Sequence, residues 1–232
     1  MKINSKVVQY IRVSINERKR KVEQYIYSNT PVYIKDPLIS DHISIESVIK
    51  KLKKILPSFF FQCFDYIYIG HFDEFLERDV NAMYKDGVVY VSNVQDDEED
   101  MLDDIIHEIC HGLEEMYPGD IYGDGTIEKE FFSKRKKLYY ILKSRNYDIS
   151  PTYFFDDKFN EEFDDFLYKE VGYPLLRTLT TGLFTDPYSI TSLREYFAQG
   201  NVYYYLKNRI ELNKTCPALF QKIEELRAIS GE

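Results

Sequence analysis

The stretch His107-Glu108-Ile109-Cys110-His111 constrains this chain more than any other. Two histidines at this spacing share one face of an α-helix, because the helix repeats about every 3.6 residues. Both imidazoles can then bind one metal ion, and Glu108 lies beside them, where it can reach a water molecule at the metal. Apolar residues recur at helical spacing around the motif and predict that this helix is buried on one face: Leu102, Ile105, Ile106, Ile109 and Leu113.

Composition narrows the class of protein. With 232 residues, 44% of them hydrophobic, the chain can bury a full core. A net charge of −9 argues against a general nucleic-acid binder. The three cysteines Cys63, Cys110 and Cys216 form no Cys-x-x-Cys pair, which is typical of a reduced compartment without a disulfide framework. We find no apolar stretch suited to a membrane span or a signal peptide, so we expect a cytoplasmic protein, with signal-independent export left open.

Periodicity predicts an α+β chain. Helices with one buried face are expected over residues 5–28, 45–56 and 126–144. Ser44 is expected to cap the second helix. The third is expected to point its basic residues largely outward: Lys134, Arg135, Lys136 and Lys137. A further helix is expected to start at Asn160, and a short one over 74–78. Two β-rich runs, residues 66–70 and 88–92, predict strands of a central sheet. No linker or repeat divides the sequence, so we expect one domain over residues 1–232.

The second β-rich run, Val88-Val89-Tyr90-Val91-Ser92, follows the turn Lys85-Asp86-Gly87 and directly precedes the motif helix. In a zinc peptidase such a strand can form the sheet edge along which an extended peptide substrate pairs through backbone hydrogen bonds. The alternative is an ordinary interior strand, and the sequence does not choose between them.

A catalytic zinc needs three protein ligands and an open position for water, so the two histidines leave one ligand to find. Glu128 or Glu130, shortly after the motif, lies about where thermolysin-like enzymes place a glutamate. Glu195 lies much farther along the chain. Spacing alone does not choose among them.

The segment Tyr188-Ser189-Ile190-Thr191-Ser192-Leu193-Arg194-Glu195-Tyr196-Phe197-Ala198-Gln199, with the residues that follow to Phe220, resembles the C-terminal signature of the anthrax lethal factor catalytic-domain family, which includes the secreted Pro-Pro endopeptidases. Members pair His-Glu-x-x-His with a later Glu-[Tyr/Phe]-Phe-Ala helix. The resemblance covers 103–112 and 188–226. It implies that Glu195 is the third zinc ligand and that Tyr188 donates a hydrogen bond to the oxyanion.

The resemblance also implies a gluzincin-like fold: a small twisted sheet packed by helices, with the His-Glu-x-x-His helix beneath a substrate cleft. Residues 117–185, acidic and aromatic, are then a helical insertion between the two halves of the site. Gln199 stands where many relatives carry a second glutamate. We expect a glutamine there to support the metal ligands with a hydrogen bond but without a charge.

The function implied is that of a zinc-dependent endopeptidase acting on a peptide or protein substrate, with one Zn²⁺ and with Glu108 as general base. The alternative is a non-catalytic, toxin-like or phage-like effector that keeps a zinc site. Glu108 favours the enzyme, because a purely structural zinc site has no use for a carboxylate beside its ligands.

Overall fold

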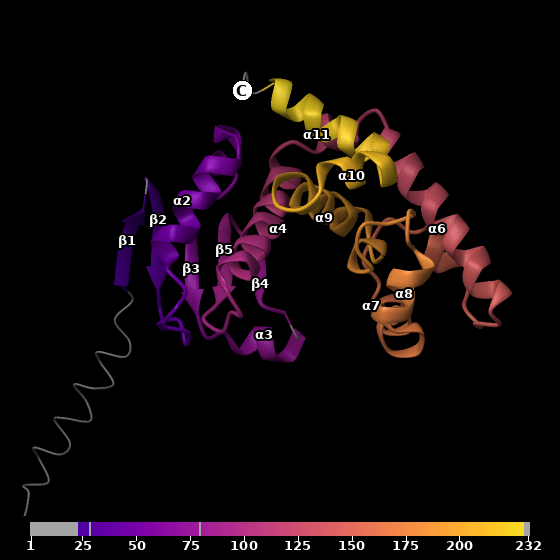
Figure 1. Cartoon of the computed structure of the whole chain (residues 1–232), viewed down its shortest axis with the longest axis horizontal. Coiled ribbons are helices and arrows are strands. Elements are labelled where there is room, and N and C mark those ends of the chain that lie inside the picture. Colours follow the sequence, from indigo (N-terminus) through magenta and orange to yellow (C-terminus); the bar gives the residue numbers. More distant parts are fainter. Residues whose placement is uncertain (1–22, 28, 79, 230–232) are drawn as a thin grey trace, which may run out of the picture. The chain divides into compact units, whose positions relative to one another are not determined.

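The computed structural model describes residues 23–27, 29–78 and 80–229, which group into two compact units (Figure 1). Unit 1 comprises the described part of Met1–Lys54 together with Phe61–Ile105, and unit 2 comprises Ile55–Phe60 and Ile106–Glu232 as far as it is described. Helix α4, Glu98–Met116, begins in unit 1 and ends in unit 2. The predicted α+β class is confirmed, whereas the single domain and the gluzincin-like fold stay predictions.

Unit 1 contains a five-stranded mixed sheet in the order β1-β2-β3-β5-β4. The central pairs β2–β3 and β3–β5 are parallel, and the outer pairs β1–β2 and β4–β5 are antiparallel. Alternate residues of the three central strands are fully buried, among them Val32, Ile67 and Val89. The strand bounds are Glu23–Tyr27 for β1, Thr30–Ile34 for β2, Tyr66–Gly70 for β3, Ala82–Lys85 for β4 and Val88–Ser92 for β5.

The expectation that Val88, Val89, Tyr90, Val91 and Ser92 form a sheet edge is wrong. This strand, β5, pairs with β3 on one side and with β4 on the other. Sequence reasoning missed β4, which forms a hairpin with β5 through Asp86 and Gly87, whose φ angles of 51° and 79° are both positive. An Asp-Gly pair adopts such angles readily, and the hairpin places β4 outermost on this side of the described sheet.

The helix expected over residues 5–28 is also wrong for residues 23–27, the part of that range that the structure describes. Residues 5–22 lie outside the described part of the chain, but Glu23–Tyr27 form strand β1. Because β1 pairs antiparallel with β2 along its whole length, its conformation is set by a neighbour that helical periodicity does not reveal.

The helices of unit 1 follow their predicted limits. Helix α2, Ile45–Ile55, buries Val48, Ile49 and Leu52. The hydroxyl oxygen of Ser44 accepts a hydrogen bond from the backbone N–H of Ser47 at 3.2 Å, as expected of an N-cap. Helix α3, Asp73–Arg78, is the short helix expected near Glu74.

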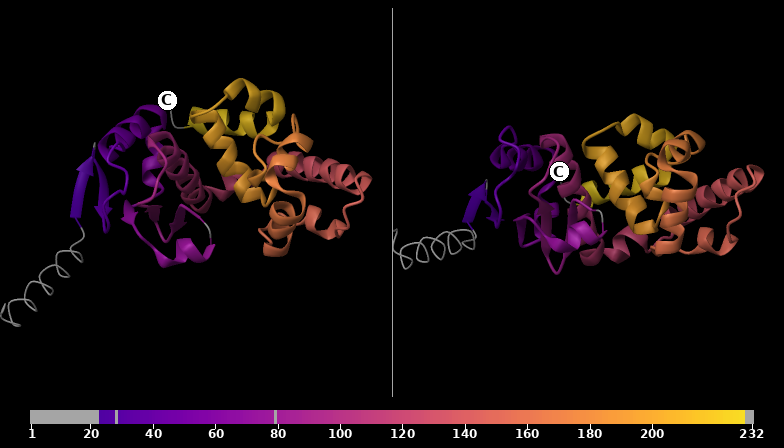
Figure 2. Two further views of the ribbon diagram at one scale, coloured as in Figure 1. Left: turned by 60° about the horizontal axis from the view of Figure 1, so that its bottom comes forward. Right: turned by 90° about the horizontal axis from the view of Figure 1, so that it is seen from below.

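Unit 2 is helical as far as it is described (Figure 2). Helix α9, Leu193–Tyr205, packs against α6, α10, α11 and the 3-10 turn η4, Tyr188–Ile190. The helices α6, Thr126–Ser144, and α7, Glu161–Asp165, begin as predicted, with Asn160 capping α7. The remaining α-helices are α5, Pro118–Tyr122, α8, Tyr173–Leu179, α10, Arg209–Thr215, and α11, Pro217–Ile229. The other turns of unit 2 are η2, Pro151–Phe155, and the π-helical η3, Phe166–Val171, while the turn η1, Ser58–Gln62, begins in unit 2 and ends in unit 1.

Two side chains on α6 correct the expectation of an outward basic face. Lys134 and Arg135 are 6% and 0% exposed. The guanidinium of Arg135 lies between the rings of Phe131 and Phe163, 4.9 and 4.6 Å from their centroids. Lys134 donates hydrogen bonds to the backbone carbonyls of Leu183 and Thr215. Both cations therefore belong to the core of unit 2, where carbonyl oxygens and aromatic faces replace water.

Gly200, inside α9, lies where α9 packs against α11. A Cβ atom at this residue would overlap the side chain of Leu219 on α11. The two helices therefore approach closely at this point. The three cysteines are buried. None of the described helices combines the length and the apolar character that a membrane crossing requires.

Candidate metal centre

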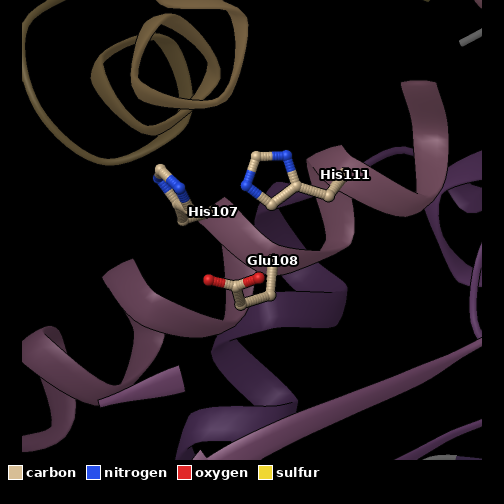
Figure 3. A group of neighbouring side chains, drawn as sticks. All are labelled: His107, Glu108 and His111. Atoms are coloured by element: carbon tan, nitrogen blue, oxygen red, sulfur yellow. The ribbon is translucent and has the colours of Figure 1, made fainter. Parts of the chain in front are cut away.

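Helix α4 carries the two histidines on one face, as the spacing predicts (Figure 3). The helix starts where Asp97 accepts hydrogen bonds from the backbone N–H groups of Glu99 and Asp100, at 2.7 and 2.9 Å. The rings of His107 and His111 lie with their centroids 4.9 Å apart. Ligand atoms of His107, Glu108 and His111 all lie within 4.8 Å of one another in a buried group that could hold a metal ion.

Glu195 brings its carboxylate to both histidines. Its Oε2 atom lies 2.8 Å from Nε2 of His107, and its Oε1 atom lies 3.6 Å from Nε2 of His111. Glu195 is 9% exposed, and within the described part of the chain its Oε2 atom makes no contact with the geometry of a hydrogen bond. A buried carboxylate oxygen without a hydrogen bond is costly unless a cation balances it. The arrangement therefore suits a metal ion held among these three residues.

Local sequence places Glu195 in this position. Ser192 caps α9 by accepting a hydrogen bond from the backbone N–H of Glu195 at 3.2 Å. This puts Glu195 in the first turn, where the helix N-terminus favours a negative charge. Tyr196 and Phe197, which follow, are buried and anchor the helix. The fold thus joins two motifs that are far apart in the sequence.

The protonation states suit metal binding. Burial lowers the pKa of His111 to about 3, helped by the positive charges of His107 and Arg194, so its imidazole is neutral at neutral pH. Burial alone would raise the pKa of Glu195, but the close approach and charge of His107 outweigh burial and lower it. A neutral imidazole, as at His111, and an ionised carboxylate, as at Glu195, are forms that bind metal ions.

Tyr188 lies next to His107, in the turn before α9. Its ring centroid is 6.2 Å from that of His107. Its backbone N–H donates a 2.8 Å hydrogen bond to Asp186, which fixes the start of the turn. Burial, and then the negative charge of Glu195, raise the pKa of Tyr188. The phenol therefore keeps its proton at neutral pH and can donate a hydrogen bond.

Gln199 contacts the outer nitrogen of His107, as a residue that supports a metal ligand should. Its Nε2 atom lies 3.3 Å from Nδ1 of His107, and its buried Oε1 atom has no hydrogen-bond partner among the described residues. If the side-chain amide of Gln199 is rotated by half a turn, its Oε1 accepts a hydrogen bond from Nδ1–H of His107. Gln199 Oε1 and His107 Nδ1 then both have a hydrogen-bond partner. That proton position leaves the lone pair of Nε2 free for a metal.

Sequence reasoning missed a group around the outer nitrogen of His111. Glu114 Oε2 lies 3.0 Å from Nδ1 of His111, and Arg194 Nε lies 2.8 Å from the same nitrogen. The hydroxyl of Tyr122 donates a hydrogen bond to Glu114 Oε1. Burial raises the pKa of Glu114 to about 8, while Tyr122 and Arg194 act to lower it. One signal was available, because residues three apart on a helix are neighbours and Glu114 follows His111 at that distance.

The alternative third ligands lie elsewhere. Glu130 accepts a 2.8 Å hydrogen bond from the hydroxyl of Tyr196, and its carboxylate also accepts the backbone N–H groups of Ala218 and Leu219 at 3.0 and 3.2 Å. It therefore stabilises the first turn of α11. The side chain of Glu128 is exposed. The strand residues Val88–Ser92 belong to unit 1, whereas the residues of the metal centre belong to unit 2.

Comparison with known proteins gives no family model, no curated protein and no solved structure that matches this chain.

Proposed function

We propose that this protein is a zinc-dependent endopeptidase. The observation that carries the proposal is the approach of the Glu195 carboxylate to Nε2 of both His107 and His111, at 2.8 and 3.6 Å. Ligand atoms about 2.0–2.1 Å from one zinc in a tetrahedral site lie roughly 3.3 Å from each other. The two separations in the structure, one to each oxygen of the carboxylate, bracket that value. Two imidazoles and one carboxylate are also a ligand set that zinc peptidases use.

The residues around this ligand set support hydrolysis rather than a purely structural site. A zinc ion bound by His107, His111 and Glu195 would supply a Lewis acid and lower the pKa of a water molecule. Glu108 is on the same helix turn as His107 and is suited to take a proton from that water. Tyr188 keeps its proton and is suited to stabilise negative charge on the carbonyl oxygen of a peptide bond.

The test uses the full chain and two measurements. We expect the purified protein to bind one zinc ion and to cleave members of a peptide library. Glu108→Gln should keep the zinc and lose cleavage by about 10²- to 10⁴-fold, the usual contribution of a general base. Glu115→Gln is the matched control, because Glu115 is an exposed acid on the same helix. It should keep both zinc and activity.

Each outcome has a definite meaning. Failure of the wild-type protein to bind zinc would overturn the metal centre. Zinc binding without cleavage of any peptide, in both the wild type and the Glu108 variant, would favour a non-catalytic effector that keeps a zinc site. Equal cleavage by wild type and Glu108→Gln would remove Glu108 from the mechanism.

A further inference from the structure

The outer nitrogen of His111, Nδ1, has two neighbours: one can accept a hydrogen bond from it and the other donates a hydrogen bond to it. A neutral imidazole carries one proton, on either Nδ1 or Nε2. Glu114 Oε2, 3.0 Å from Nδ1, can accept a proton from that nitrogen, whereas Arg194 Nε, 2.8 Å away, can only donate to it. The choice of partner therefore decides which nitrogen of His111 is free to bind a metal.

Only the contact with Glu114 prepares the ring for the metal centre. When Nδ1–H donates to Glu114, the lone pair of Nε2 faces Glu195 and the rest of the ligand set. When Nδ1 accepts from Arg194, the proton is on Nε2 and blocks that position. Glu114 is thus the neighbour of His111 that matches its proposed role as a ligand.

The carboxylate of Glu114 is itself held in place. Glu114 is 8% exposed and accepts a hydrogen bond from the hydroxyl of Tyr122 on α5 through its other oxygen. Arg194 Nε lies 3.5 Å from Glu114 Oε2 and supplies a counter-charge. A carboxyl group held through both of its oxygens can hold the ring of His111 in one orientation.

We propose that Glu114 is a positioning residue, which accepts the Nδ1 proton of His111 and directs Nε2 toward the metal, with Tyr122 fixing its carboxylate. The inference rests on the proposed zinc centre. It assigns Glu114 no contact with substrate and no proton transfer in the reaction. It implies that zinc affinity depends on a residue outside the ligand set.

The experiment measures zinc affinity by competition with a chromophoric chelator, with no substrate present. We expect Glu114→Ala to weaken zinc binding by about 10- to 100-fold, the usual effect of losing such a partner. Glu114→Gln should restore part of the affinity, because its amide oxygen still accepts the Nδ1 proton. Tyr122→Phe should give a smaller loss. Glu115→Ala, next in sequence but exposed and 3.8 Å from a different nitrogen of Arg194, is the control and should bind zinc as the wild type does.

A second readout separates positioning from a general loss of structure. In ¹⁵N NMR spectra of the zinc-loaded protein, His111 should carry its proton on Nδ1, and Glu114→Ala should broaden or shift that signal while the signals of residues distant from α4 stay in place. Unchanged zinc affinity in Glu114→Ala, or an equal loss in Glu115→Ala, would overturn the inference while leaving the zinc centre intact. Absence of zinc binding in the wild type would instead overturn the proposed function.

Discussion

Glu195 Oε2 lies 2.8 Å from Nε2 of His107, although the two residues come from separate helices, α9 and α4. In the proposed zinc centre two ligands come from α4 and one comes from α9. Zinc affinity should therefore depend on how α9 packs within unit 2. A substitution that disturbs this packing should weaken zinc binding. This relation leads to predictions both about the ligands and about the residues that hold the helices.

Glu195→Gln should weaken zinc binding by more than the roughly 10- to 100-fold that follows the loss of an outer partner, because a neutral amide replaces a charged ligand. Isothermal titration or chelator competition measures the change. Glu130→Gln is the informative comparison. It should lower the melting temperature, since Glu130 accepts the backbone N–H groups of Ala218 and Leu219, but it should leave zinc affinity unchanged. The reverse order of zinc losses would make Glu130 the ligand.

Much of the centre could be predicted because its residues follow local rules. Helical spacing alone aligned His107 with His111, and a serine before an apolar run predicted the cap at Ser44. The relation of Glu195 to α4 was suggested by a family resemblance. Spacing had left that relation open, because local rules do not describe how distant helices pack.

The errors have a different origin: each depends on a partner that the periodicity of a single segment does not show. Strand β5 lies inside the sheet because β4 pairs with it, and Glu23–Tyr27 is a strand because β2 lies beside it. Arg135 is buried because Phe163, from another helix, covers its guanidinium. A charged residue at an outward-looking position carries no local sign of such a neighbour.

Arg135→Met should destabilise the protein although it removes a buried charge. The guanidinium donates hydrogen bonds to the backbone carbonyls of Asp156 and Thr191. Each carbonyl left without a partner costs about 1–3 kcal/mol. Thermal or urea unfolding measures the loss. Lys136→Met is the control, because Lys136 is exposed on the same helix; it should change stability by no more than about 0.5 kcal/mol. Equal stabilities of the two variants would contradict the core role of Arg135.

Gly200→Ala should lower the melting temperature, although alanine favours helices by about 1 kcal/mol relative to glycine. The new methyl group would overlap Leu219 and force α9 and α11 apart. Overpacking of this kind typically costs about 1–3 kcal/mol, which outweighs the gain in helix propensity. Gly119→Ala on α5 is the control, because a Cβ atom there would meet nothing within 4 Å. A variant at Gly200 that melts at or above the wild-type temperature would show that Leu219 moves aside without cost.

The ion pair between Asp124 and Lys222 should make stability depend on acid pH. Lys222 is buried and donates a hydrogen bond to Asp124, and Thr126 donates two more. The hydrogen bond from Lys222 is the largest cause that holds the pKa of the Asp124 carboxyl well below its usual range. Because the folded pKa is lower than the unfolded value of about 3.9, the stabilisation is complete above that pH and is lost as the pH falls through the folded pKa.

Asp124→Asn should therefore melt at a lower temperature than the wild type at pH 7, and the difference should shrink as the pH falls below about 4, where the Asp124 carboxyl of the unfolded wild-type chain begins to gain its proton. Melting curves recorded at a series of pH values for both proteins measure this. Asp120→Asn, which changes an exposed acid in the preceding helix, is the control and should show no such convergence. A difference between Asp124→Asn and wild type that stays constant down to pH 2 would mean that the charge of Asp124 does not stabilise the fold.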